Sequence, residues 1–436
     1  MRRPRLRDTD RAILGLAIPA LGTIAIDPLL TMIDTAFVAR VGTSELAALG
    51  VDAAILSFAF FAFNFLAFAT TPLVARALGL GDTEKAAGFV GSAIFLVVVL
   101  GVFMTALVHA LAPALVGLMG AEDEVAELAV SYLRIRAFAT VAVLMILTGH
   151  GAFRGHKDTR TPFRVAVAVN LVNLVLDPLL IFGAGWGLEG AAVATVTAQW
   201  VGAAWFFVMI RRRRMAVFSR RIRESLPAIV TLGRNGALLT VRSAFLLLTI
   251  AVAASAATRL GPESIAAHQL VFQGWILSMM AADALEISAQ ALVGEEAGRG
   301  NLAAVDSLVR RLLGWAAVLG VFLAVFIWVA RPLLGLLTED PEVASLAVSA
   351  AAIAGLSLTV GAVLFTADGV FSGLLAFGTM AMSTAAGNLV TVALLWWSPL
   401  RHSLEGVWWA MTVFLVARGL VLAARYRPAA TAAVSA

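Results

Sequence analysis

The sequence predicts an all-α polytopic membrane protein with twelve transmembrane helices, arranged as two six-helix halves in tandem. Three observations carry this prediction: the composition, the length of the apolar runs, and an internal repeat. Of the 436 residues, 61% are hydrophobic and only 14% are charged. Soluble domains are about half apolar and about a quarter charged, so this composition is typical of a chain that lies mostly in a bilayer.

Each predicted span is an apolar run of about twenty residues or more, which is the length that a helix needs to cross a bilayer. Short polar segments or Gly/Pro breaks separate the runs, and the longest of them imply tilted helices or ends that protrude into water. The predicted spans are 12–38, 46–75, 86–112, 124–149, 160–183, 188–210, 227–257, 263–293, 303–329, 342–367, 376–397 and 404–424.

The basic residues predict the orientation of the chain. They are concentrated in alternate loops, whereas the intervening loops hold only Arg40, Arg259, Arg331 and Arg401. Positive loops stay in the cytoplasm, so we expect both termini to be cytoplasmic, in a bacterial inner membrane. The longest basic segment, 211–226, is predicted to be a cytoplasmic linker on the anionic inner leaflet, between an N-terminal lobe 1–210 and a C-terminal lobe 227–436.

An internal repeat relates the two halves. The segment ARVGTSELAALG at 39–50 matches TRLGPESIAAHQ at 258–269, and GAFRG at 151–155 matches GVFSG at 369–373. Six spans in each half is an even number, so the repeats have the same orientation in the membrane. Parallel repeats of this kind are typical of transporters in which two bundles rock around a central site.

The first span carries two carboxylates and two prolines. Asp27 and Asp34 are seven residues apart, so they lie on one face of the helix. An aspartate in the middle of a membrane costs about 2.5–3.5 kcal/mol, which indicates a face that lines a functional cavity. Pro19 and Pro28 each remove a backbone hydrogen bond, so we expect this helix to bend.

Several polar residues of the first half differ from their counterparts in the second half, which are apolar or, at one position, a smaller threonine. At the repeat spacing, Asp34, Tyr132, Asn173 and Asp177 correspond to Ala253, Ala350, Thr391 and Leu395. Burial and a nearby carboxylate both favour the protonated form of a carboxyl group. The pattern therefore predicts a proton or cation site made of Asp34, Asp177, Asn173 and Tyr132.

Other polar residues are further candidates with open alternatives. Asp27 and Asn64 are candidates for the same cluster in the first half. Asp283 and Glu286 of the second half either form a second cation site, contact a cationic substrate, or pair with Arg242, and Asp368 is a further acid within a span of that half. Arg134 and Arg136 either pair with the acids of the first half or, as we expect, lie nearer the aqueous mouth of the fourth span.

The absence of several motifs argues against enzymes and ATP-driven pumps. There is no cysteine, no phosphate-binding loop that ends in Lys-Ser/Thr, no HExxH and no nucleophile elbow. We therefore expect no catalytic residues, no cofactor and no certain metal site. The basic net charge lies in short interhelical loops, so it does not indicate nucleic-acid binding.

Taken in order, the motifs resemble the multidrug and toxic compound extrusion (MATE) transporters, and in particular their DinF-like branch. They are IDTAFVARVG at 33–42, YLRIRAF at 132–138, FRGHKDTRTP at 153–162, NLVNLVLDP at 170–178, and ADGVFSG at 367–373. The resemblance covers essentially the whole chain. It implies two six-helix lobes around a central cleft, with Asp34, Tyr132, Asn173 and Asp177 in the cation cluster of the N-terminal lobe. It also implies that the first helix bends at Pro19.

The function expected from these residues is export of an organic, cationic or lipophilic compound in antiport with H⁺. The alternatives are antiport with Na⁺, and a flippase for lipids or lipid-linked saccharides. The seventh span offers Arg242 where the sodium-coupled branch of the family has an acid, which favours protons. The expected partners are a small organic substrate and the bilayer, and we expect a functional monomer.

Overall fold

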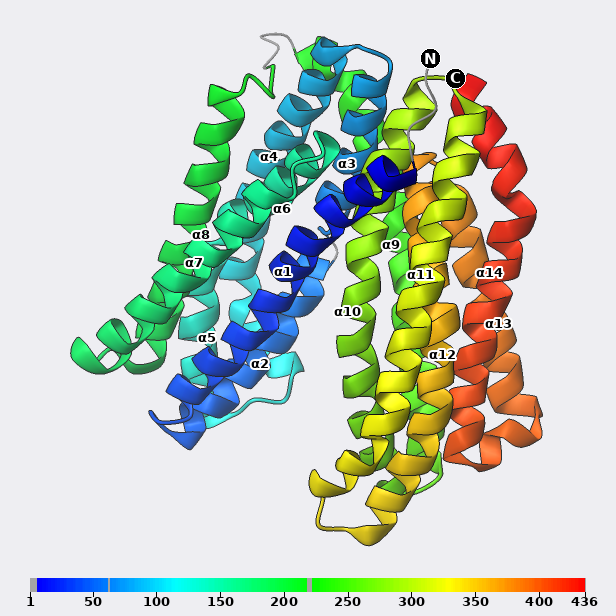
Figure 1. The fold of residues 1–436 in the computed structure, drawn as a ribbon. Coiled ribbons are helices and arrows are strands. Elements are labelled where there is room, and N and C mark those ends of the chain that lie inside the picture. Colours follow the sequence, from blue (N-terminus) through cyan, green and yellow to red (C-terminus); the bar gives the residue numbers. More distant parts are fainter. Residues whose placement is uncertain (1–5, 62, 218–221, 436) are drawn as a thin grey trace. The chain divides into compact units, whose positions relative to one another are not determined.

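The computed structural model describes residues 6–61, 63–217 and 222–435, and every regular element in those ranges is a helix (Figure 1). The helices form two units. The N unit runs from Gly22 to Arg234, and the C unit comprises the start of the chain up to Leu21 together with everything from Asn235 onward. Both boundaries fall inside helices, namely α1 (Leu6–Val38) and α9 (Ile222–Arg259).

The N unit contains the larger part of α1 and the helices α2 to α8. Its further elements are α2 (Thr43–Phe61), α3 (Phe65–Gly79), α4 (Thr83–Leu118), α5 (Asp123–Ala137), α6 (Thr140–Gly155), α7 (Arg160–Pro178), the π-helical turn η1 (Leu179–Gly183) and α8 (Gly187–Arg212). Two predicted single spans are therefore corrected. The run 46–75 consists of α2 and α3, and the run 124–149 consists of α5 and α6, which are bent by 50° against each other.

Side chains from neighbouring helices stabilise the break between α5 and α6. The break leaves the carbonyls of Ala137 and Phe138 without helical partners. Thr105 of α4 and Thr140 donate to the Ala137 carbonyl at 3.0 and 2.7 Å, and the indole of Trp200 on α8 donates to the Phe138 carbonyl at 3.1 Å. Irregular backbone at membrane depth requires such partners, because lipid offers none. The sequence pattern could not reveal this break, since the apolar run continues through it.

The C unit consists of long and mostly unbroken helices. They are α9, α10 (Pro262–Gly298), α11 (Leu302–Ala330), α12 (Pro341–Gly373), α13 (Phe377–Trp397) and α14 (Leu404–Ser435), with short 3₁₀ turns η2 (Arg331–Leu336) and η3 (Pro399–His402). All twelve predicted spans correspond to described helical segments. The prediction of an all-α protein with two six-helix halves is thus confirmed.

Glycines at one helix crossing show the repeat in three dimensions. In the N unit, a Cβ on Gly151 of α6 would lie 3.0 Å from the Ala67 carbonyl oxygen of α3. In the C unit, a Cβ on Gly369 of α12 would lie 2.4 Å from the Glu286 carbonyl oxygen of α10. Both pairs are related by the repeat spacing, as is the next glycine along each helix. Close approach of two helices through small residues is thus the scaffold that both halves share.

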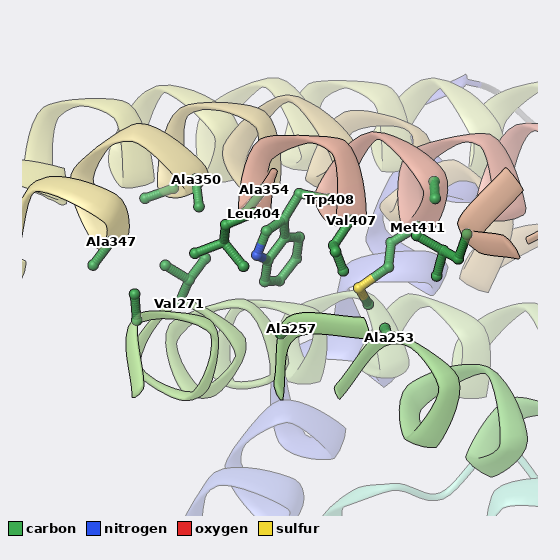
Figure 2. Packing of buried hydrophobic residues seen from close by; sticks show 14 of the residues in the cluster. Ala253, Ala257, Val271, Ala347, Ala350, Ala354, Leu404, Val407, Trp408 and Met411 are labelled. Atoms are coloured by element: carbon green, nitrogen blue, oxygen red, sulfur yellow. The ribbon is translucent and has the colours of Figure 1, made fainter. Parts of the chain in front are cut away.

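A hydrophobic cluster fills the C unit where α9, α10, α12 and α14 meet. Figure 2 shows Trp408 of α14 in the middle of this cluster, close to side chains from the other three helices. The indole is fully buried. The cluster includes Ala253, Val271, Ala350, Ala354 and Leu395, all of them at most 7% exposed. This core matters for the site, because these positions correspond to polar residues in the N unit.

The first residues after α8 are fastened to the N unit. Met215 is buried, and the amide of Val217 donates to the Ala87 carbonyl of α4 at 3.1 Å. Arg213 donates to the carboxylate of Asp158 at 2.7 Å. Burial acts to raise the pKa of Asp158, but hydrogen bonds from the Thr161 amide and hydroxyl and from Arg213 outweigh it and hold the pKa below its usual value. Part of the linker, residues 218–221, lies outside the described residues.

Candidate functional site

Two residues of α7 form the best-defined part of the candidate site. Asn173 and Asp177 are one helical turn apart and are both buried, at 5% and 1% exposure. The Asn173 amide nitrogen donates to Asp177 Oδ1 at 3.2 Å and lies 3.4 Å from the hydroxyl of Thr195 on α8. Asp177 stands directly before Pro178 and the π-helical turn η1. Local departures from α-helix of this kind are frequent at functional sites.

Asp34 of α1 meets Asp177 across the N unit. The two carboxyl groups lie within hydrogen-bonding contact of each other. Asp34 Oδ1 and Asp177 Oδ2 are both buried, and neither accepts a hydrogen bond from another described group. Two ionised carboxylates in such contact repel each other, whereas one shared proton forms a hydrogen bond between them. The geometry of this pair is thus suited to holding a proton.

Two charged residues near this pair were not among the predicted site residues. Asp52 of α2 is fully buried, and Arg136 of α5 lies close enough to act electrostatically on Asp34, Asp52 and Asp177. Of the two alternatives for Arg136, proximity to the acids therefore applies, because α5 ends at the break and carries Arg136 to them. Its neighbour Arg134 is exposed, as expected. Tyr132, one turn before Arg136, is buried at 6% exposure within electrostatic range of the same acids.

A comparison of the two halves of the repeat identifies Asp52 and Arg136 as site residues. At the repeat spacing, Asp52 corresponds to Val271 and Arg136 to Ala354. Both counterparts belong to the hydrophobic cluster around Trp408, as do the counterparts of Asp34 and Tyr132 (Figure 2). The counterpart of Asp177, Leu395, belongs to the same cluster. These five residues thus share one property: each is polar in the N unit and corresponds to a residue of the hydrophobic core in the C unit.

The remaining predicted residues of the first half do not join this cluster by any described contact. The side chain of Asp27 lies outside the described residues. Asn64 stands at the break between α2 and α3, where its side chain makes no capping hydrogen bond. The helix α1 continues through Pro19 and Pro28, so bending at these prolines stays a prediction. The boundary between the two units falls at Leu21 and Gly22, close to Pro19.

The acids of the second half form a separate buried network with two arginines. Arg242 Nη2 donates to Asp368 Oδ2 at 2.6 Å, and Arg418 Nη2 donates to Asp368 Oδ1 and Oδ2 at 3.0 and 2.7 Å. Asp368 and Arg418 have no solvent exposure. Ion pairing with Arg242 was expected of Asp283 or Glu286, whereas the structure gives the direct pair to Asp368. Arg418 was not foreseen, because a single arginine near the end of the last span looks like a snorkelling residue.

Glu286 and Asp283 lie on α10 beside this network. Glu286 is buried, and Gln290 donates to its Oε1 at 3.2 Å. Both Glu286 and Asp283 are within electrostatic range of Arg242. The carboxylate oxygens of Asp368 are thus already occupied by two guanidinium groups. Among the residues that the structure describes, no group of three acidic or histidine side chains could hold a metal ion.

Comparisons with known proteins place this arrangement in a family. The MatE family matches residues 19–179 and 239–397, which is more than half of the chain. The chain is 30% identical to Protein DETOXIFICATION 44, chloroplastic, of Arabidopsis thaliana over 95% of this chain and 82% of that protein. It is 28% identical to DNA damage-inducible protein F of Escherichia coli K12, over 97% and 93% of the two chains.

A solved structure confirms the fold. The Vibrio cholerae MATE transporter VcmN in its bent form matches with a TM-score of 0.91 at 22% identity, over 98% of each chain. The structural match thus covers nearly the full length of the predicted twelve-helix arrangement. The chain is therefore a multi-pass membrane protein that belongs to the MATE family of multidrug and toxin efflux transporters.

Proposed function

We propose that this protein exports organic cations or lipophilic compounds in exchange for protons, and that Asp34 and Asp177 carry the coupling proton. The observation that carries this proposal is the contact between their two carboxyl groups, in which one oxygen of each lacks any other donor. A proton between them is the group that such a contact requires. Asn173 donates a hydrogen bond to Asp177, and the Thr195 hydroxyl of α8 is a second partner of the same Asn173 amide.

The proton changes the balance between two packings of the N unit. With the proton bound, the pair carries one negative charge and its members attract each other. When the proton leaves to water on the cytoplasmic side, two carboxylates face each other and repel, which favours a packing in which α1 and α7 separate. A cationic substrate is favoured in that state, because it replaces the lost positive charge. Proton and substrate thus bind alternately, which is antiport.

The second unit favours protons over sodium. Sodium needs several oxygen ligands, and both oxygens of Asp368 already accept hydrogen bonds from guanidinium groups. A sodium-coupled cycle would therefore have to rely on oxygens of the N unit. A flippase for pyrophosphate-linked lipids is less consistent with three carboxyl groups in the N unit, since they repel a polyphosphate.

Transport in proteoliposomes tests the proposal. We would impose a pH gradient and a sodium gradient separately and follow ethidium, a fluorescent organic cation. We expect ethidium flux with the pH gradient alone. Asp34→Asn and Asp177→Asn should each abolish that flux while the protein still elutes as a folded monomer. Asp306→Asn is the matched control, because Asp306 pairs with the exposed Arg427 and should keep wild-type flux.

Two results would contradict the proposal. One is flux that responds to sodium and ignores pH, which would assign the cycle to the alternative ion. The other is wild-type coupling in both Asp34→Asn and Asp177→Asn, which would remove the pair from the mechanism. We further propose that both termini lie in the cytoplasm, on the basis of the asymmetric basic loops. We also propose that the protein acts as a monomer in a bacterial inner membrane.

A further inference from the structure

Asp52 is a buried carboxyl group that the proposed cycle does not yet use. It lies on α2 with no solvent exposure, and neither carboxylate oxygen accepts a hydrogen bond from a described group. An ionised carboxylate without donors is very costly to bury, whereas the neutral acid loses far less on leaving water. In this packing, Asp52 is therefore suited to carrying a proton.

Among the described residues, Arg136 is the positive charge that acts on all three acids of this site. Its Nε and Nη1 atoms are buried and donate to no acceptor, yet the guanidinium lies within electrostatic range of Asp34, Asp52 and Asp177. It thus acts on all three carboxyl groups through its charge, without a hydrogen bond from either atom. Removing that charge would leave three acids with no counter-charge in a region of low dielectric.

The other titratable groups on the helices around α2 have their own partners or lie farther along the helices. On α4, the ring of His109 bonds the Thr105 carbonyl. On α5 and α8, Glu124 and Glu189 accept hydrogen bonds from Ser44 and Ser131. The groups that face the site are therefore Asp34 from α1, Asp52 from α2, Tyr132 and Arg136 from α5, and Asp177 from α7.

A count of these charges gives the number of protons. Three carboxylates and one guanidinium leave a net charge of minus two, so two protons make the site neutral. The pair Asp34 and Asp177 shares one of them, and Asp52 is the remaining acid. The repeat supports the same grouping independently, since Asp52 and Arg136 both correspond to residues in the hydrophobic core of the C unit.

We propose that Asp52 is a second proton-carrying residue of the N unit and that Arg136 is its fixed counter-cation, so that the site exchanges two protons in each cycle. This inference rests on the proposed proton coupling. Each proton passes from water to a carboxylate oxygen on one side of the membrane and returns to water on the other. No bond other than O–H forms or breaks.

The number of protons can be measured at the point of zero net flux. With the membrane potential clamped at zero and a difference of one pH unit imposed, the ethidium ratio at zero flux is tenfold for each proton exchanged. We expect about a hundredfold ratio for the wild type and about tenfold for Asp52→Asn. Asn keeps the shape of Asp but carries no proton, and Asp306→Asn should keep the wild-type ratio.

A second variant and a second measurement distinguish the loss of a proton site from a folding defect in Asp52→Asn. Arg136→Gln should move the pH profile of transport to higher pH by about one unit, because the site then holds its protons more tightly, while Arg136→Lys keeps the wild-type profile. The infrared spectrum of the wild type should show the band of an isolated protonated carboxyl group, and this band should be missing in Asp52→Asn.

The outcomes separate this inference from the proposal beneath it. No pH-driven flux in the wild type would remove proton coupling as a whole. Proton-driven flux with one proton in both the wild type and Asp52→Asn would overturn only the role of Asp52. Complete loss of flux in folded Asp52→Asn, or an unchanged pH profile in Arg136→Gln, would also overturn it.

Discussion

Replacing Asp368 by Asn should destabilise the C unit more than any change at its two arginine partners. The substitution leaves Arg242 and Arg418 close together without their shared carboxylate. Both guanidinium groups are then buried positive charges that repel each other. Replacing Arg242 by Gln instead leaves Asp368 with Arg418, which still donates to both oxygens at 3.0 and 2.7 Å. Asp368 and Arg418 of that variant still form a pair of opposite charges.

The structure sets the size of each effect. Breaking a buried ion pair by removing one partner costs about 3–5 kcal/mol, because it leaves an uncompensated charge. Asp368→Asn should reach this range, since Asp368 and Arg418 have no solvent exposure. Arg242→Gln should cost about 1–3 kcal/mol, the contribution of a hydrogen bond to a charged group.

Asp306 supplies a control with the same bond lengths but more solvent. It accepts hydrogen bonds from Tyr426 and Arg427, both at 2.7 Å, and the Arg427 side chain is 67% exposed. Water screens this pair, so Asp306→Asn should cost at most about 1 kcal/mol. Reversible unfolding of the purified protein in mixed micelles, with each free energy taken against the wild type, provides the comparison.

The order of the three free energies decides the argument. If Asp368→Asn were as stable as Asp306→Asn, the two guanidinium groups would have to find other partners, and the network would not be a structural ion pair. If Asp368→Asn also abolished a sodium-driven flux, Asp368 would be an ion ligand. That result would reverse our reading of the C unit.

Two further predictions concern the scaffold and the linker. Gly369→Ala should destabilise the protein, because its Cβ would lie 2.4 Å from the Glu286 carbonyl oxygen. The control Gly274→Ala meets nothing within 4 Å and should be neutral or stabilising by up to about 1 kcal/mol. Thermal unfolding of the two variants provides the comparison. Equal unfolding temperatures would show that α10 and α12 can separate freely. The pKa of folded Asp158 lies below the unfolded value, so its contribution to stability is complete above about pH 4 and is lost as the pH falls through the folded pKa. The free-energy difference between wild type and Asp158→Asn should shrink from below about 1 kcal/mol at pH 7 toward zero at acidic pH, and a constant difference would contradict this.

The sequence predicted the helices well because their cause is local. A helix needs about twenty apolar residues to cross a bilayer, and runs of that length can be recognised directly in the sequence. The two broken spans escaped prediction because their causes are distant in sequence. The carbonyls at Ala137 and Phe138 are satisfied by Thr105 and Trp200, which lie on other helices. An apolar run contains no record of such partners.

The candidate site was predictable where chemistry and symmetry were considered together. Asp34, Asn173 and Asp177 were found because each is polar in one half and apolar or small in the other, and the structure brings them together. Asp52 follows the same rule, since its counterpart is Val271, but the rule was not applied to it. Arg418 could not be predicted, because its partner Asp368 is on another helix of the same unit.

Because the two halves share the glycine crossing, the residue at each position of the C unit is a substitution that the corresponding position of the N unit should tolerate structurally. The backbone around Gly151 and around Gly369 is built alike, so each core position of one half shows what the other half can accommodate. Evolution has placed alanine, valine or leucine at the counterparts of Asp34, Asp52, Tyr132, Arg136 and Asp177, and these residues pack around Trp408. An inactive but folded N unit can therefore be designed by replacing its site residues, one at a time, with their counterparts from the C unit. Such a chimeric series would separate the residues that keep the bundle folded from those that make it work.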